Sequence, residues 1–531
     1  MQTSSPTLLE KQQRFSQSLL WQLQRNFYNQ QGIQAWNSGV LPHYATSNPT
    51  IAYAYAKVIL AYLRDHLQNH TLDPSHPLYI LELGAGCGRF AFYCLRYLQR
   101  HLPLLGASLP PVVYVMSDFT QSNLDYWQHH GHLKPFLEAG ILDFSVVDAT
   151  AIDSLYLAHS GQRISATSLK NPLIAIANYF FDCIPQDVFV IEGGKLHESL
   201  VTLTTSHPTP DLETPDLIDS LDITFIDQET TSNYYNDPHF NAILANYQTT
   251  LTDTTLLFPS TALKCLRQLH QLAQGRLLLL SADQGYNRFE DLRDGLHPRL
   301  NPHGQSFSMM VNFHAIGQYT QHLGGTWLTT PHYRPSFTIN AFLFSDLEQS
   351  LAQTQEAYNE HILTGGPDDF LAFNQGLDSH YDALSLSQLL AYLRLSHWDF
   401  IIFWSAFPSL MGKLKDAPKV LYPDILTAVQ QVWLNYFPIQ EEFDLAFLLG
   451  TVLYTLGYFP EALEYWQQSR QLYGEDPSTL FNMAMCHYRL HQLELAIDFI
   501  QQTLALDPDF EGAKAKYLEW QAELMQQAHT A

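Results

Sequence analysis

The chain has few cysteines for its length, and they show no paired spacing. There are five in 531 residues, and each stands apart from the others. Disulfide frameworks and structural zinc sites need cysteines at matched intervals. The sequence therefore predicts reduced thiols, no disulfide and no zinc. The cysteines are Cys87, Cys94, Cys183, Cys265 and Cys486.

No apolar run approaches the roughly 18 residues that cross a bilayer. The first residues, Met1–Pro6, lack the basic and apolar regions of a secretion signal. We therefore expect a cytoplasmic protein without membrane contact. Histidines are numerous but scattered, and their one cluster, His129–His132, has no cysteine or acid at metal-ligand spacing. No metal is expected.

Basic residues are scarce relative to acidic ones, 27 against 52, which gives a net charge of −25. Such a surface repels a phosphate backbone, so nucleic acid is not an expected partner. With 46% hydrophobic residues, the chain can form two or three domains with real cores.

The most informative motif joins a buried strand to a helix through alternating glycines. The apolar run Leu78–Leu83 contains Glu82, then come Gly84, Ala85, Gly86 and Gly88, and an apolar helical stripe follows. A dinucleotide fingerprint places its third glycine one residue later, and a P-loop needs a lysine after it, so neither fits. An ordinary glycine-rich turn is the simpler alternative.

Glu-x-Gly-x-Gly-x-Gly resembles the first motif of class I S-adenosylmethionine-dependent methyltransferases. In that family the glycine loop passes under the methionine part of the cofactor. The resemblance implies a Rossmann-like α/β domain and S-adenosylmethionine as cofactor.

Further apolar strands end in polar residues, as expected of βαβ units with a ligand at the carboxyl ends of the strands. One is Val112–Asp118, followed by Phe119, and another leads to Asp148 and Ala149. By resemblance, Asp118 binds the ribose hydroxyls, and Asp148 with Ala149 lies beside the adenine. Each aspartate could instead be a helix N-cap.

A second resemblance is to the MidA-like methyltransferases, which include the mitochondrial arginine methyltransferase of complex I assembly. It rests on the stretches 177–185, 280–286 and 306–313 and covers about residues 45–345. It implies that Asn178 contacts the cofactor. Tyr179 replaces the family's glutamate and Met310 its histidine, which leaves Asp182 and Asp283 as candidates to assist deprotonation of the acceptor.

The chain divides into three regions. Residues 1–75 are expected to be a helical lid, with a helix from Gln12 to Asn29, and the methyltransferase domain is expected at 76–348. Tyr44, Ser47 and Asn48 mark either the lid or a capped helix start.

From about residue 365 to 531 the chain is expected to be all-helical. The segments 443–476 and 477–510 align at an offset of 34, with small residues at Gly450, Ala462, Ala484 and Ala496. This resembles the tetratricopeptide repeat, whose period is the same. Such repeats imply a protein or peptide partner, although they could also only buttress the other domain.

An insertion at 196–263 carries ten acids and no lysine or arginine. Its first third is expected to be a loop and 240–251 a short helix, with its ends near the transferred methyl group. It is either a solvated surface segment or an acidic wall that attracts a cationic peptide.

The sequence as a whole predicts a methyltransferase that acts on a protein. The alternative is a scaffold with little or no turnover, which the loss of the family's glutamate at Tyr179 favours. The acceptor, the methylated atom, the oligomeric state and the partner are not indicated.

Overall fold

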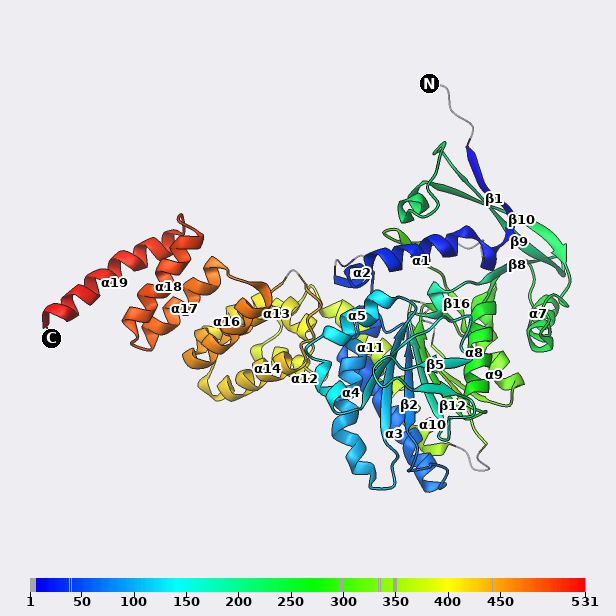
Figure 1. Ribbon diagram of the computed structural model, residues 1–531, viewed down its shortest axis with the longest axis horizontal. Coiled ribbons are helices and arrows are strands. Elements are labelled where there is room, and N and C mark those ends of the chain that lie inside the picture. The colour runs from blue at the N-terminus through cyan, green and yellow to red at the C-terminus, as the bar shows by residue number, and fades with distance from the viewer. Residues whose placement is uncertain are drawn as a thin grey trace. The chain divides into compact units, whose positions relative to one another are not determined.

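The computed structural model describes residues 6–37, 39, 41–293, 295, 300–332, 334, 336–346, 351–441 and 443–530. These residues form two compact units, Met1–Leu371 and Ala372–Ala531. Figure 1 shows a mixed α/β first unit and a helical second unit, as the sequence predicts. Each unit is described by itself.

A seven-stranded sheet forms the centre of the first unit. Its strand order is β17-β18-β12-β7-β2-β3-β4, and the five strands from β12 to β4 are parallel. Strand β18 pairs antiparallel with β12, and β17 with β18. The strands are β2 (Leu78–Leu83), β3 (Val112–Asp118), β4 (Leu142–Val146), β7 (Leu173–Asn178), β12 (Leu277–Asp283), β17 (Thr326–Thr329) and β18 (Thr338–Phe344).

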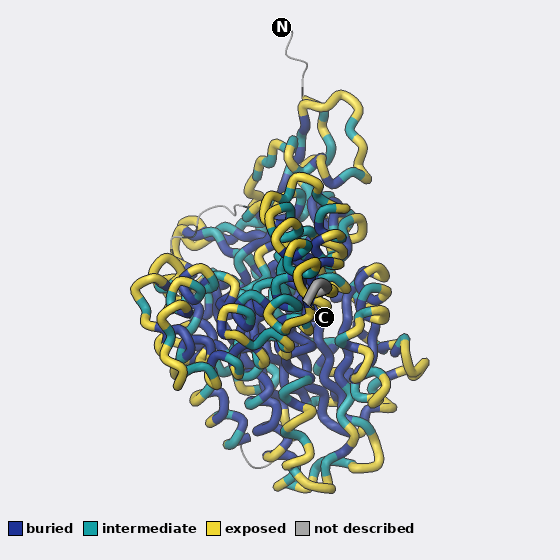
Figure 2. Tube along the Cα trace, turned by 90° about the vertical axis from the view of Figure 1, so that its left-hand side faces the viewer, coloured by how far each residue is buried: buried dark blue, intermediate teal, exposed yellow. Residues whose placement is uncertain are grey.

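Strands β2, β12 and β18 are buried along their whole length because helices cover both faces of the sheet. In Figure 1 helices α3 (Pro49–Gln68), α4 (Arg89–His101) and α5 (Gln121–His129) lie on one side of the strands. Helices α8 (Ser260–Leu272) and α9 (Phe313–His322) lie on the other. Figure 2 shows the sheet as a buried region beneath exposed loops.

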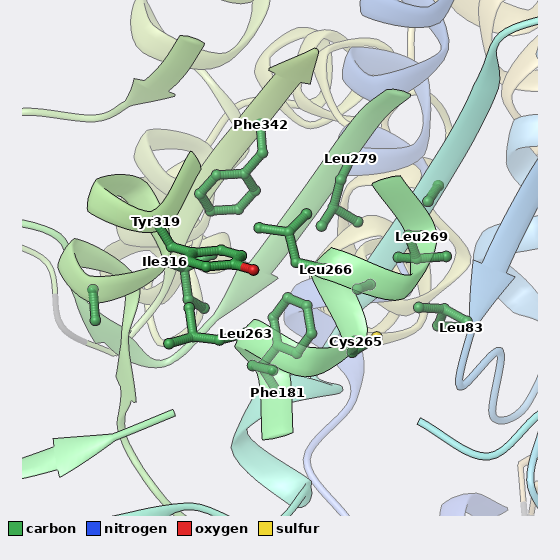
Figure 3. Close-up of a cluster of buried hydrophobic side chains, with 14 of the residues drawn as sticks. Leu83, Phe181, Leu263, Cys265, Leu266, Leu269, Leu279, Ile316, Tyr319 and Phe342 are labelled. Carbon is green, nitrogen blue, oxygen red and sulfur yellow. The ribbon is translucent and has the colours of Figure 1, made fainter. Parts of the chain in front are cut away.

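Figure 3 shows how α8 and α9 pack on the sheet. Leu266 and Leu269 of α8, with Tyr319 of α9, lie against Leu279 and Phe342 of the strands. Phe181, from the turn after β7, joins the same cluster and is fully buried. The core of this face therefore reaches the segment in which the sequence places the site.

A second, antiparallel sheet lies beside the first and corrects two expectations. It contains β1 (Thr7–Arg14), β8 (Asp187–Glu192), β9 (Lys195–Thr205), β10 (Leu221–Thr230) and β11 (Thr254–Phe258). The segment expected to be helical from Gln12 is a strand up to Arg14, because it pairs with β9, and α1 begins only at Leu19. The first third of the acidic insertion is a loop only from 206 to 214, since Leu196 to Thr205 pairs along its length with β10.

Three acids of the insertion form ion pairs with basic residues outside it. Glu198 pairs with Arg14 at 3.2 Å, Glu229 with Lys195 at 2.9 Å, and Asp237 with Arg267 at 2.8 Å. Asp237 also caps α7 (Pro238–Thr250), which matches the expected short helix. Part of the insertion's negative charge is therefore neutralised within the unit.

Shorter elements connect these layers. Helix α1 (Leu19–Gln31) and helix α2 (Gln34–Asn37) precede a turn and α3, whose N-cap is Asn48. Helix α10 (Ala352–Tyr358) packs on α3, where Asp65 accepts hydrogen bonds from the backbone of Gln353 and Thr354. The remaining short elements are α6 (Lys134–Glu138), β5 (Ser154–Tyr156), β6 (Arg163–Ser165), β13 (Gly285–Tyr286), β14 (Asn301–His303), β15 (Ser306–Ser308) and β16 (Val311–Asn312).

The second unit is helical throughout its described residues, as expected. Helix α11 (Pro367–Leu377) leads into it. Its own helices are α12 (Leu386–Leu395), α13 (Phe400–Leu414), α14 (Tyr422–Leu434), α15 (Leu445–Leu456), α16 (Phe459–Tyr473), α17 (Pro477–Arg489), α18 (Leu493–Leu506) and α19 (Glu511–Thr530).

Helices α15 with α16, and α17 with α18, form two successive pairs. The four small residues that align at an offset of 34 are all fully buried: Gly450, Ala462, Ala484 and Ala496. A Cβ atom on Gly450 would lie 2.6 Å from Nε1 of Trp466. The close approach of α15 and α16 therefore depends on the missing side chain.

We expect Gly450→Ala to destabilise this helix pair by about 1–3 kcal/mol, because the new methyl group overpacks the indole of Trp466. Gly412→Ala is the matched control, since Gly412 is also helical but a Cβ there has nothing within 4 Å. The control should be stabilising by about 0.5–1 kcal/mol. Amide hydrogen exchange in α15 and α16 measures the effect of Gly450→Ala, and exchange in α13 measures that of Gly412→Ala. Unchanged protection of α15 and α16 in Gly450→Ala would contradict the expectation.

Candidate active site

A cavity of about 350 Å³ lies where the central parallel strands end. Its walls come from the loops after β2, β3, β4 and β7, and from the segment of α1, α2 and the turn before α3. Strand order reverses between β2 and β7, and open parallel sheets bind ligands at such a point. The site predicted from the sequence and the cavity therefore occupy the same edge of the sheet.

The glycine loop forms the floor of the cavity. Gly84, Gly86 and Gly88 have φ of +64°, +52° and +85°, which side chains rarely allow. A Cβ on Gly86 would lie 3.0 Å from the ring of Trp36, and one on Gly84 at the same distance from Phe180. The missing side chains of Gly84 and Gly86 thus make room for Phe180 and Trp36, while both glycines and Ala85 line the cavity, and α4 begins directly after the loop.

Glu82 lies beside this floor and is 4% exposed. Its carboxyl accepts a hydrogen bond of 2.8 Å from the hydroxyl of Tyr114. Burial raises the pKa of Glu82 to about 8, against the smaller opposing effect of that hydrogen bond. The side chain is therefore mostly protonated at neutral pH and can donate a hydrogen bond.

Asp118 ends β3 and is 6% exposed in the cavity wall. One of its oxygens accepts from the backbone and hydroxyl of Thr120, and the other accepts from Asn123 at 3.0 Å. Burial raises its pKa despite these bonds. The carboxyl is held rigidly, as a diol-binding group requires, and its interaction with Thr120 also fits the simpler capping role.

Asp148 and Phe119 are bound by a residue that the sequence analysis missed, Arg25 of α1. Its guanidinium pairs with Asp148 at 2.9 Å and lies over the ring of Phe119, 4.6 Å from the centroid. The other oxygen of Asp148 accepts from Thr150. Phe119, Asp148 and the adjoining Ala149 do line the cavity, with α1 closing it on that side.

Asn178 and Tyr179 end β7 at the centre of the cavity. The side-chain oxygen of Asn178 accepts from the hydroxyl of Tyr55 at 3.0 Å and from the amide of Ala282 at 3.1 Å. Its buried Nδ2 has no hydrogen-bond partner among the described residues. Tyr179, with φ of +45°, adopts a conformation that is strained for an aromatic residue and is typical of functional sites.

The two candidate catalytic aspartates lie close together, but only one of them lines the cavity. Asp182 lines the cavity, whereas the fully buried Asp283 lies behind it and accepts hydrogen bonds from the amides of Phe180 and Phe181, at 3.1 and 3.0 Å. Burial raises the pKa of both carboxyls, and the charge of Asp182 raises that of Asp283 further. Ionisation of Asp182 therefore disfavours ionisation of Asp283.

Several cavity residues carried no sequence signal. Tyr28, Trp36 and His43 come from the N-terminal segment, and His303 and Ser308 come from the β14–β15 hairpin. Ser47 lines the cavity as well, while Asn48 caps α3. The apolar residues at helical spacing in α1, among them Phe27 next to Tyr28, indicated a helix that packs on another element, but not which element. No residue of the insertion 196–263 lines the cavity, contrary to the expected position of its ends.

The comparisons with known proteins agree with this site. A family model described as "Putative S-adenosyl-L-methionine-dependent methyltransferase" matches residues 62–298, which include the glycine loop, Asp118 and Asn178. The protein is a methyltransferase that uses S-adenosylmethionine. A search of curated proteins finds no match.

Two solved structures from Burkholderia thailandensis are similar to the first unit at low identity. One is an uncharacterized protein, with 13% identity over 65% of this chain and 90% of its own, at a TM-score of 0.38. The other is bound to S-adenosyl-homocysteine, with 14% identity over 66% of this chain and 90% of its own, at a TM-score of 0.39.

The residues of the cavity fit S-adenosylmethionine. The bare backbone of the glycine loop allows close approach, Asp118 offers carboxyl oxygens near the end of β3, and the unpartnered amide of Asn178 offers a donor. When bound, the cofactor supplies a methyl group on a positively charged sulfur. These residues would hold and orient it, and α1 and α2, which line the cavity, would exclude water.

The sequence predicts no metal, and the group of side chains that could hold an ion lies away from the cavity. Among the described residues, His332, Asp368 and Asp369 are the group whose potential ligand atoms lie within 4.8 Å of one another. They do not line the cavity. His130 and His132 of the histidine cluster lie side by side, with His132 against Phe92.

We expect Gly86→Val to abolish binding of S-adenosylhomocysteine, because a branched side chain strains a residue at φ +52° and collides with Trp36. Asp118→Ala should weaken binding by about 1.5–3 kcal/mol, the cost of hydrogen bonds to a charged group. Calorimetry on folded protein measures both. Asp125→Ala, an exposed aspartate on α5, is the control, and a loss of affinity equal to that of Asp118→Ala would refute the role of Asp118.

The raised pKa of Glu82 predicts a pH dependence of stability in the cofactor-free protein. The unfolded chain ionises Glu82 near pH 4.5, whereas the folded protein keeps it protonated up to about pH 8. Its contribution is therefore fully present below pH 4.5 and is lost as pH rises to about 8, by on the order of 1 kcal/mol per unit.

Glu82→Gln removes this ionisation and keeps a hydrogen-bond acceptor for Tyr114. Between pH 5 and 8 the variant should lose less unfolding free energy than the wild type in denaturant titrations. Glu138→Gln, at an exposed position, should leave the wild-type dependence unchanged. Parallel curves for the wild type and Glu82→Gln would show that Glu82 ionises in the folded protein at its ordinary pH.

Proposed function

We propose that this methyltransferase acts on a protein and that the helical unit recruits the acceptor. The resemblance of residues 443–510 to tetratricopeptide repeats supports this, since such repeats bind peptides in a concave groove. The buried small residues at Gly450, Ala462, Ala484 and Ala496 are consistent with that packing. We also propose a MidA-like relationship for the first unit and a cytoplasmic location, on the sequence evidence above.

The observation that carries the proposal is the exposed apolar surface of the helical unit. Large apolar side chains with more than two fifths of their surface exposed are concentrated there. Where such side chains gather into a contiguous patch, they mark a surface that binds a partner. Examples, each on a different helix, are Leu472 of α16, Leu495 of α18 and Leu518 of α19.

The cavity supports transfer to a side chain. Asp182, Cys183 and Pro185, from the segment after β7, line it, and Asp182 places a carboxyl there. A hydrogen-bond donor on the acceptor is therefore favoured. The role of Asp182 in deprotonation stays a prediction, and so does that of Asp283, whose position behind the turn suits it to hold Asp182.

The test uses radiolabelled S-adenosylmethionine, the purified protein and an extract of the source cells. We expect label in protein, and the triple variant Leu472→Ser, Leu495→Ser and Leu518→Ser should reduce it while leaving affinity for S-adenosylhomocysteine unchanged. Leu104→Ser and Leu212→Ser, at exposed positions of the first unit, are the control. Label found only in small molecules, or equal labelling by all three proteins, would contradict recruitment by the helical unit.

A further inference from the structure

Beyond the residues that fit the cofactor, the cavity is lined by a polar wall. Two elements distant in sequence form it: the turn Phe181–Cys183 after β7, and the β14–β15 hairpin. From the turn come Asp182 and Cys183, and from the hairpin come His303 and Ser308. Gln284, just after β12, lies between them.

A chain of hydrogen bonds runs from Asn301 through Gln284 and Ser308 to His303. Asn301 donates to the side-chain oxygen of Gln284 at 3.1 Å, which turns the amide nitrogen of Gln284 toward the wall. That nitrogen donates to Oγ of Ser308 at 2.6 Å and lies 3.4 Å from Oδ2 of Asp182. Because Ser308 already accepts from Gln284, its own proton is free to donate to Nε2 of His303, at 2.9 Å.

The other titratable groups at this wall are buried. Burial raises the pKa of the Cys183 thiol and of the Tyr28 phenol, which faces it from α1. Burial also raises the pKa of Asp182 and of Asp283, and the charge of Asp182 raises that of Asp283 further. Burial lowers the pKa of His303 below 6.5, with a smaller opposing effect from Asp182, so its imidazole is neutral at pH 7.

We propose that this wall is the methyl-acceptor site and that the Ser308–His303 pair removes a proton from an acceptor that carries one on nitrogen or oxygen. The proposal rests on the methyltransferase function described above and names the chemical class of its substrate.

The step conserves atoms and charge. The acceptor's proton passes to Oγ of Ser308, which gives its own proton to Nε2 of His303, while the acceptor atom bonds to the methyl carbon and the electrons of the broken carbon–sulfur bond remain on sulfur. The resulting imidazolium lies near the negative charge of the Asp182–Asp283 pair, which stabilises it. Gln284 keeps Ser308 oriented throughout.

The decisive variant is His303→Gln, because glutamine can accept the hydrogen bond from Ser308 but cannot take up its proton. His207→Gln, at an exposed position of the insertion, is the control. The probes are p-cresol and benzylamine, which must lose a proton at pH 7, and pyridine, whose ring nitrogen takes a methyl group without losing one.

We expect His303→Gln to reduce transfer to p-cresol and benzylamine by about 10²- to 10⁴-fold, the usual contribution of general base catalysis. Transfer to pyridine and affinity for S-adenosylhomocysteine should be unchanged. An equal loss with pyridine would show a structural role for His303, and no loss with any probe would exclude it as the base; either result overturns the proposal. Loss with only one of p-cresol and benzylamine identifies oxygen or nitrogen as the acceptor atom.

A second measurement needs no turnover. In proton NMR of the complex with S-adenosylhomocysteine, the histidine resonance missing from His303→Gln should titrate below pH 6.5, and Asp182→Asn should lower its pKa further by removing the neighbouring charge. A pKa above 6.5, or one that Asp182→Asn leaves unchanged, overturns the proposal. Failure of the wild type to bind S-adenosylhomocysteine would instead refute the cofactor site, so the two claims fail separately.

Discussion

The buried carboxyl of Asp283 is the interaction on which the site most depends. It ends β12 and accepts hydrogen bonds from successive backbone amides of the turn after the neighbouring strand β7. These amides would otherwise be buried without partners, which is costly in a protein interior. The carboxyl therefore fixes the path of the chain after Asn178, including the unusual conformation of Tyr179, and points Asp182 into the cavity.

The same arrangement explains why two carboxyls can lie side by side in a buried position. Ionising both buried carboxyls is strongly unfavourable, so the charge of Asp182 raises the pKa of Asp283. Asp182 faces the cavity, next to Gln284 and the hairpin that carries His303. A structural constraint of the sheet thus also sets the electrostatics of the wall proposed to bind the acceptor.

The N-terminal segment completes the cavity from outside the sheet. Helix α1 is fixed by Gln24, which donates to the carbonyl of Phe307 in the β14–β15 hairpin, and by Arg25, which binds Asp148 and Phe119. One helix therefore contacts both the proposed acceptor wall and the opposite end of the cofactor site. Its exclusion of water strengthens every polar interaction within the cavity.

Short sequence patterns determined the elements that depend only on neighbouring residues in the chain. The apolar run before Gly84 and the alternating glycines specify a buried strand, a tight turn and a helix start, whatever surrounds them. The same holds for the strand ends at Asp118 and Asn178 and for the offset of 34 between the helix pairs of the second unit. Because parallel strands bring their carboxyl ends to one edge, these signals were enough to place the cofactor site.

Only the tertiary structure decided which distant residues reach that edge. The local sequence of residues 7–14 predicts a helix or a polar segment. These residues instead form a strand that pairs with β9, because the unpaired backbone groups that β9 would otherwise expose outweigh a weak local preference. Arg25, His303 and Ser308 belong to no motif, and long-range packing alone brings them to the cavity. The difference between Asp182, which faces the cavity, and Asp283, which lies behind it, likewise depends on a hydrogen bond across two strands that no sequence spacing encodes.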